Sequence, residues 1–272
     1  MSTVGVRRAG PGDLDAIAAL TRRLRHRLSR WEPGFWRRAA GADELHPLWL
    51  GHLLGTGETP ARVATRGGEV VGCAFSVRQP GQWFVDDVAV ASDGDWADAG
   101  AALLAAVAER PALTCVPRVD RARAAATTAA GWEHVSDYRL QAVPGPGTRP
   151  AGPAGPADPP PAAGLPAPPH TFGGPFDPAA PGALVVAGPA GSAVGSPAVA
   201  APPVYDPGGT TCVVDRVDGP DLPALLDAVA AAAAALGARQ LVVVCGAGDA
   251  ALRAALDERR FRHPVEVFRA PS

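Results

Sequence analysis

The sequence predicts an α/β protein of two lobes, each a mixed central sheet flanked by helices. Three observations predict this fold class. The chain has 272 residues, which exceeds one ordinary domain. Segments with strand periodicity and segments with helical periodicity alternate along most of its length. Residues 144–170 are dominated by proline, glycine and alanine, a composition typical of an unfolded linker between residues 1–143 and residues 171–272.

The elements of the first lobe follow from periodicity and turn residues. A short strand is predicted at Val4–Arg8, and helical spacing of leucines predicts a helix at Pro11–Leu28. A second helix is predicted at Asp43–Leu54, and Gly67–Gly68 between two apolar runs predicts a hairpin. The second helix should bury one face, formed by Leu45, Leu48, Trp49 and Leu53. The later predicted elements are strand 83–90, helix 96–109, strand 112–116, helix 120–130 and strand 134–140.

The second lobe repeats the later part of this order. The separation of Asp87 from Trp132 nearly equals that of Asp215 from Phe261, and each aromatic residue follows a helix and precedes a strand. An internal duplication explains this, with a second lobe that lacks the first strand and the first two helices. Its predicted elements are strands 183–187, 198–204 and 211–217, helix 221–236, strand 240–245, helix 249–259 and strand 265–268.

Composition excludes several classes of function. The net charge is −2 and every basic residue other than histidine is arginine, so no basic footprint for nucleic acid is expected. No apolar run approaches the roughly 20 residues of a membrane-spanning helix, and the first residues do not form a secretory signal. The four cysteines are far apart in apolar runs, which predicts buried thiols, no metal site and a cytoplasmic protein (Cys73, Cys115, Cys212 and Cys245).

Three segments of the first lobe resemble the GNAT N-acetyltransferases. Val6–Ile17 resembles the family's first strand and the start of its first helix. Gly68–Ala74 resembles a central hairpin of the family, and Arg123–Trp132 resembles its late helix with a terminal glycine–aromatic pair. The resemblance covers about the first 140 residues. It implies acetyl-CoA as the acyl donor and an amine, on a small molecule or a protein, as the acceptor.

The family holds the diphosphate of acetyl-CoA with a loop and helix start rich in glycine and in arginine or glutamine. Ala91–Gly100 is the matching stretch, but Asp95 replaces the expected arginine and Asp98 replaces a glycine, so both should repel the diphosphate. The alternative is structural: Ser92 caps a helix, with Asp95 as its partner. By resemblance, the residues expected to contact the cofactor are Val88, Val90, Asp95, Trp96, Gly100 and Ala101.

A carboxylate on the central strand often serves this family as general base, so the resemblance makes Asp86 and Asp87 the candidate catalytic residues. Strand alternation predicts that they point to opposite faces. The alternative is that one is solvated and the other pairs with an arginine. No tyrosine occurs in Ala124–Ala130, where the family often has its general acid. Two functions therefore stay open: an acyltransferase with a degenerate cofactor loop, or a catalytically silent module that binds a ligand or partner.

Overall fold

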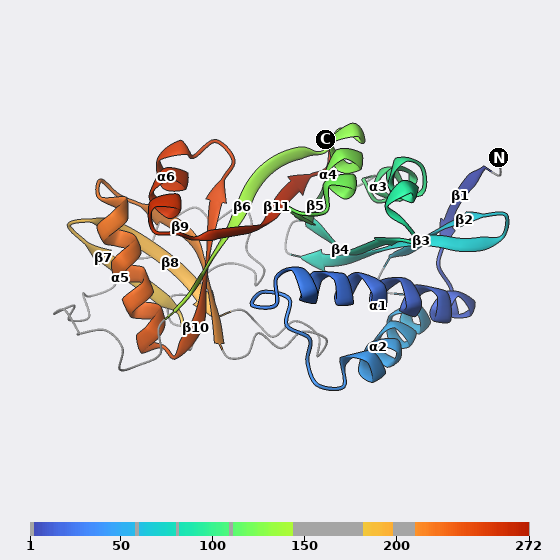
Figure 1. The fold of residues 1–272 in the computed structure, drawn as a ribbon, viewed down its shortest axis with the longest axis horizontal. Coiled ribbons are helices and arrows are strands. Elements are labelled where there is room, and N and C mark those ends of the chain that lie inside the picture. Colours follow the sequence, from blue (N-terminus) through green and yellow to red (C-terminus); the bar gives the residue numbers. More distant parts are fainter. Residues whose placement is uncertain are drawn as a thin grey trace. The chain divides into compact units, whose positions relative to one another are not determined.

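A computed structural model describes residues 3–57, 60–79, 82–108, 111–143, 182–197 and 210–271 (Figure 1). These residues belong to two compact units. Unit 1 contains the described residues up to Val135 and from Val265 onward, and unit 2 contains those from Ser136 to Pro264. The boundaries fall inside two strands, β6 (Glu133–Ala142) and β11 (Arg262–Arg269). The predicted linker at 144–170 and the predicted strand at 198–204 lie outside the described residues.

Unit 1 contains a mixed sheet in the order β1-β2-β3-β4-β5-β11. Only β4 and β5 are parallel, and the other neighbours are antiparallel. The predicted hairpin is confirmed: Gly67 and Gly68 form the turn between β2 and β3 with φ of 61° and 90°, which glycine adopts without strain. The strands of this unit are β1 (Val4–Arg8), β2 (Ala61–Arg66), β3 (Glu69–Gln79), β4 (Gln82–Val90), β5 (Ala112–Pro117) and the last part of β11.

Helices cover both faces of this sheet (Figure 1). On one face the apolar side of α1 packs on Cys73 and Ala89, and on the other face α3 packs on Ala74 and Val88. The alternation of Cys73 and Ala74 between the two cores is what a strand buried on both sides requires. The helical elements are η1 (Pro11–Asp13), α1 (Leu14–Trp31), α2 (Ala42–Thr56), η2 (Asp93–Ala97), α3 (Ala99–Val107) and α4 (Arg121–Ala129).

The predicted buried face of α2 is wrong. Leu48 is 72% exposed, and Leu45 and Trp49 are exposed as well. The buried face carries His46 together with Ala42, Leu50 and Leu54. Apolar residues occur on two sides of this helix, so spacing alone does not identify the side that packs against α1. Burial of the polar ring of His46 is possible because α1 supplies hydrogen-bond partners for it.

Unit 2 contains a second mixed sheet in the order β6-β10-β9-β8-β7, in which β9 and β10 are parallel. Helices α5 and α6 contribute Leu226 and Leu256 to one core with Val214 and Val243. In the described parts of the chain, no helix is long and apolar enough to cross a bilayer. The elements of this unit are the end of β6, β7 (Leu184–Gly188), β8 (Gly191–Pro197), β9 (Thr210–Asp218), α5 (Leu222–Ala235), β10 (Ala238–Gly246), α6 (Ala250–Glu258) and the start of β11.

Candidate functional site

Asp86 and Asp87 form a bulge in β4. Ala74 of β3 pairs with Val88 and Ser76 pairs with Val85, so two residues of β4 lie opposite the single residue Phe75. A bulge changes the direction of side chains along a strand and commonly occurs beside active sites. The bulge therefore breaks the alternation on which the sequence prediction for the two carboxylates was based.

Both carboxylates point to the face of the sheet that α1 and α2 cover. Val85 and Val88 both pack in the core beneath α3, on the opposite face. Neighbouring side chains of a strand point to opposite faces, so Asp86, next to Val85, and Asp87, next to Val88, each point to the α1 side. The expectation that they point to opposite faces is wrong, because the extra residue of the bulge shifts the alternation by one.

The bulge coincides with the end of the pairing between β4 and β5. The parallel register runs from Trp83 to Val85, where Val85 is opposite Thr114, and it stops there although both strands continue. The backbone of β4 from Asp86 onward therefore has no β5 partner. Unpaired strand backbone offers N–H and C=O groups to an extended ligand, which can bind as an added strand does.

The electrostatic surroundings of Asp86 favour a proton-accepting role. Desolvation by the surrounding protein and, secondarily, the charge of Asp87 raise the pKa of Asp86 to about 7, against an opposing effect of Arg123. Asp86 is exposed to solvent, so it can exchange its proton with water or a bound ligand. A carboxylate that exchanges its proton near neutral pH can act as a general base.

Asp87 lies beside a buried Arg25–His46 pair that no sequence pattern indicated. Nη1 of Arg25 lies 2.6 Å from Nδ1 of His46, and Nε2 of His46 lies 3.7 Å from Oδ2 of Asp87. Arg25 and His46 are 1% and 3% exposed. Since a guanidinium only donates, Nδ1 must accept, which leaves the imidazole proton on Nε2 facing Asp87. The His46 N–H faces the second carboxylate, but 3.7 Å is longer than a hydrogen bond.

Arg123 is a second buried cation near the carboxylates. It is 2% exposed, donates from Nη2 to Oγ1 of Thr114 at 3.0 Å, and lies over the ring of Trp96 at 5.7 Å. Burial lowers the pKa of Arg123, opposed by the negative charges of Asp120, Asp87 and Asp86 among others. The positive charge of Arg123 is available to the carboxylate pair, which no sequence pattern indicated.

The cofactor loop predicted from the resemblance has its two aspartates engaged elsewhere. Oδ2 of Asp95 accepts hydrogen bonds from the backbone and the hydroxyl of Ser92, at 2.9 Å and 2.7 Å. This is the predicted capping box, which is confirmed. Arg66 donates to both Asp95 and Asp98 at 2.7 Å. Arg66 therefore offsets part of the expected repulsion of a diphosphate, since its single positive charge is shared between two carboxylates.

Gly100 serves the packing of Trp96. A Cβ added at Gly100 would collide with Cε3 of the Trp96 ring and lie 3.1 Å from Cδ2. Trp96 is 2% exposed, so its indole fills the space beside the start of α3. Of the other residues expected to contact a cofactor, Val88 is buried in the core under α3 and Ala101 is partly exposed.

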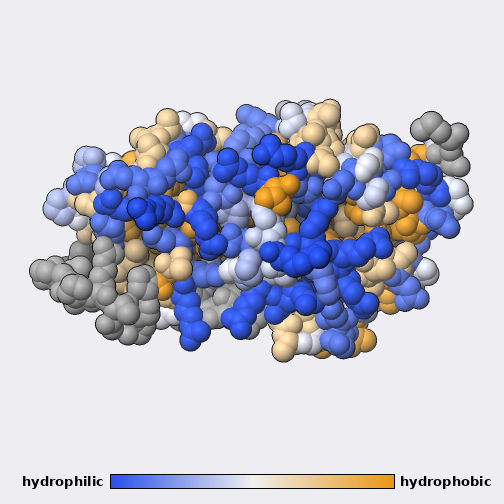
Figure 2. Space-filling view, viewed as in Figure 1, coloured by the Kyte–Doolittle hydropathy of each residue, from blue (hydrophilic) through white to orange (hydrophobic). Residues whose placement is uncertain are grey.

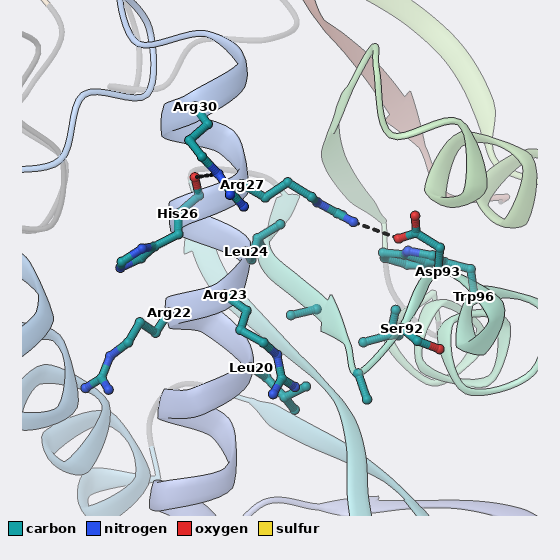
Figure 3. A pocket seen from close by; sticks show the side chains of 13 residues that line it. Leu20, Arg22, Arg23, Leu24, His26, Arg27, Arg30, Ser92, Asp93 and Trp96 are labelled. Carbon is teal, nitrogen blue, oxygen red and sulfur yellow. Dashed lines mark hydrogen bonds and ion pairs between the residues drawn. The ribbon is translucent and has the colours of Figure 1, made fainter.

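A pocket of about 430 Å³ lies between α1 and the segment that joins β4 to η2 (Figure 3). This segment contributes Val90 and Trp96, two of the residues expected to contact a cofactor. Ala89 also lines it, two residues beyond Asp87 on the same face, or roughly 7 Å along the strand. Its wall on α1 is apolar at Leu20 and Leu24 and otherwise basic, with Arg22, Arg23, His26, Arg27 and Arg30.

The chemistry open to this site is proton transfer beside a cationic pocket. Thr127, one of two hydroxyls near the expected position of a general acid, is buried and donates to the carbonyl oxygen of Arg123, while Thr128 is exposed. Among the described residues, no group of three or more histidine, cysteine, aspartate or glutamate side chains could hold a metal ion. All four cysteines are outside disulfide bonds, and three of them are buried.

Solved structures described as acetyltransferases are similar to this chain in whole or in part. A putative acetyltransferase from Thermoplasma acidophilum matches 98% of this chain with 100% of its own, at a TM-score of 0.55 and 11% identity. A GNAT-family acetyltransferase from Bacillus cereus matches 48% of this chain with 84% of its own, at a TM-score of 0.38 and 12% identity. A putative acetyltransferase from Salmonella typhimurium, solved with acetyl-CoA, matches 51% of this chain with 84% of its own, at a TM-score of 0.39 and 18% identity.

No protein-family model matches the sequence, and no curated protein sequence matches it. At identities this low the likeness is one of fold. The chain has a mixed α/β fold with a central sheet flanked by helices, as the putative acetyltransferase from Thermoplasma acidophilum has.

Proposed function

We propose that the protein is a GNAT-type acyltransferase that moves an acetyl group from acetyl-CoA to an amine. One observation carries the proposal: β4 bulges at Asp86–Asp87 at the residue where it leaves β5, and both carboxylates face the side that holds the pocket. This arrangement places a proton acceptor beside unpaired strand backbone and a cationic pocket. An acyl-CoA has the matching chemistry, with an extended amide-containing arm and an anionic head.

In the proposed reaction Asp86 is the general base. The amine nitrogen attacks the thioester carbonyl carbon, the C–S bond breaks, and an amide and the thiolate of coenzyme A are formed. Asp86 accepts the proton that the amine loses, directly or through one water, and the thiolate takes up a proton from solvent. Asp86 has this role rather than Asp87 because Asp86 is exposed, whereas Asp87 is half-buried beside His46.

We propose further that the two units are related by duplication. In unit 2 the register between β8 and β9 shifts so that Asp215 is an extra residue of β9, and the parallel pairing of β9 with β10 ends at Val214. Burial raises the pKa of Asp215 to about 7. Asp215 thus has the three features of Asp86: a bulge, the end of parallel pairing and a raised pKa.

We assign the transfer reaction to unit 1. In unit 2 the turn between β9 and α5 packs closely on Ala190, because a Cβ added at Gly219 would collide with the carbonyl oxygen of Ala190. Asp221 also donates its backbone N–H to that oxygen at 3.3 Å. The acceptor is a small-molecule or protein amine, and we propose the cytoplasm as the compartment, where cysteines remain thiols.

The test is to measure acetyl-CoA turnover with a panel of amines, using the released coenzyme A thiol as the signal. Asp86→Asn should lower kcat by about 100-fold or more, the usual contribution of a general base, while acetyl-CoA binding is retained. Asp15→Asn removes an exposed carboxylate from the first turn of α1 and should leave kcat unchanged.

One observation favours the second candidate function, a silent ligand-binding module. The backbone N–H of Ser92, at the start of the loop that would meet the cofactor, is already occupied by Asp95. If no amine is acetylated but acetyl-CoA or another acyl-CoA binds, this second function replaces the first. Equal turnover by wild type and Asp86→Asn would remove Asp86 from the mechanism.

A further inference from the structure

Three arginines of α1 face the pocket with the spacing of one helix side. Arg23, Arg27 and Arg30 are at positions i, i+4 and i+7, and all three line the pocket (Figure 3). Like charges at this spacing repel each other. Figure 2 shows strongly hydrophilic side chains gathered over α1, where Arg23 and Arg30 are exposed. The cluster is therefore open to a ligand from solvent.

The pocket contains one carboxylate against these cations. Asp93 is the acidic residue in its lining, and Arg27 already binds it, Nη1 to Oδ1 at 2.7 Å. Arg27 also binds Asp120 through Nη2 at 2.6 Å. Within the described ranges, Arg23 has no ion pair or hydrogen bond through its side chain, and Arg30 donates only from Nε to the carbonyl oxygen of His26 at 3.3 Å. Neither Arg23 nor Arg30 therefore has a carboxylate partner among the described residues.

A buried donor in the same pocket also lacks an acceptor. Trp96 lines the pocket and is 2% exposed, and its Nε1 has no hydrogen-bond partner among the described residues. A buried N–H without an acceptor is unfavourable, so native proteins rarely retain one unless a ligand or water supplies the acceptor. Nε1 of Trp96 thus lacks an acceptor, and Arg23 and Arg30, which come from a different element, lack an anionic partner.

Two backbone donors at the start of the loop are already occupied. Ser92 N–H is bound by Asp95, and Ala91 N–H is bound by the carbonyl oxygen of Val71 at 2.8 Å. The expected arginine of this loop is Asp95, which Arg66 holds. The opposite wall, which is α1, offers the arginine side chains that this end of the loop lacks.

We propose that Arg23 and Arg30 of α1, with Nε1 of Trp96, bind the diphosphate of the acyl donor in place of the β4–η2 loop. The identity of the donor rests on the proposed function, whereas the anion site rests on the pocket. The distance along β4 from Asp87 to Ser92 is roughly 16 Å, which the extended pantetheine arm of coenzyme A can span. The diphosphate then lies at α1 while the thioester reaches Asp86. Arg27 remains on Asp93 and Asp120 and closes the far side.

Calorimetric titration of the full chain with three probes tests this. The probes are acetyl-CoA, acetyl-pantetheine, which has no phosphate, and inorganic pyrophosphate. Wild type should bind acetyl-CoA at least tenfold more tightly than acetyl-pantetheine, and should bind pyrophosphate with an affinity that falls as salt is raised. Arg23→Gln and Arg30→Gln should each lower the affinity for acetyl-CoA by about tenfold and leave the affinity for acetyl-pantetheine unchanged. Arg37→Gln, which removes an exposed arginine outside the pocket, is the matched control.

The outcomes separate this inference from the proposed function. If acetyl-CoA binds equally to wild type and to both variants, the α1 site is wrong and the acyltransferase proposal stands. If pyrophosphate binds through Arg23 and Arg30 but acetyl-CoA does not bind, the anion site is supported and the acyltransferase proposal fails. Equal affinity of wild type for acetyl-CoA and acetyl-pantetheine overturns the inference without any variant. Thermal unfolding of each variant checks that the fold is retained.

Discussion

Replacing Asp95 tests whether its carboxylate is a structural cap or a defect in a cofactor loop. In the structure it accepts from the backbone and hydroxyl of Ser92 and from Arg66. Loss of a capping carboxylate costs about 1 kcal/mol of stability. The ion pair with Arg66, in which Asp95 is 11% and Arg66 33% exposed, adds about 0.5 to 1 kcal/mol. Asp95→Ala should therefore lower the free energy of unfolding by about 1.5 to 2 kcal/mol.

The pH dependence of this loss has a definite sign. The Ser92 hydroxyl first, and then Arg66, lower the pKa of Asp95 against an opposing desolvation. A depressed carboxyl pKa stabilises the fold above the unfolded value of about 4, and that contribution disappears as pH falls through the folded value. The difference between wild type and Asp95→Ala should be full at pH 7 and smaller at pH 3.

Thermal unfolding at these two pH values is the assay. At pH 7 the midpoint of Asp95→Ala should be about 4 to 8 °C below that of wild type. Asp15→Ala, in the first turn of α1, is the control and should change stability by less than about 0.5 kcal/mol. A stability equal to wild type at pH 7 would refute the capping role. By the same reasoning, Asp95→Arg and Asp98→Gly remove partners of Arg66 and should destabilise η2.

Two further predictions concern Gly100 and the protonation of Asp86. Gly100→Ala should lower the free energy of unfolding by about 1 to 2 kcal/mol because the Trp96 ring must move. Gly55 lies in a helix with open space around it, so Gly55→Ala should raise the free energy of unfolding by about 0.5 kcal/mol. Urea unfolding of both variants distinguishes the two signs. Because the pKa of Asp86 is raised, its contribution to stability is lost as pH rises from about 4 through about 7. The melting temperature of Asp86→Asn should therefore gain on that of wild type between pH 4.5 and pH 8. The kcat/KM of wild type should rise with pH to a plateau above about pH 7. A pH-independent difference in melting temperature would contradict the raised pKa.

Local pattern was sufficient for much of this protein. The order of strands and helices in unit 1, the hairpin at Gly67–Gly68 and the capping box of Ser92 and Asp95 were all predicted, since periodicity, turn residues and caps act over a few neighbouring residues. The sequence also singled out Asp86 and Asp87, because two adjacent carboxylates in an apolar strand are conspicuous. It did not indicate Arg25, His46 or Arg123, whose roles depend on partners that are distant in the sequence.

The sequence by itself determined the fold class, the succession of elements and the residue types at the carboxylate pair. Only the tertiary structure decided which face of α2 is buried, that Asp86 and Asp87 share a face, and that Asp95 is held by Arg66. It also decided that the end of β11 pairs with β5 in unit 1. The physical reason is common to all four: each depends on contact between segments far apart in the chain, where strand register and packing select among arrangements that local propensity leaves equal.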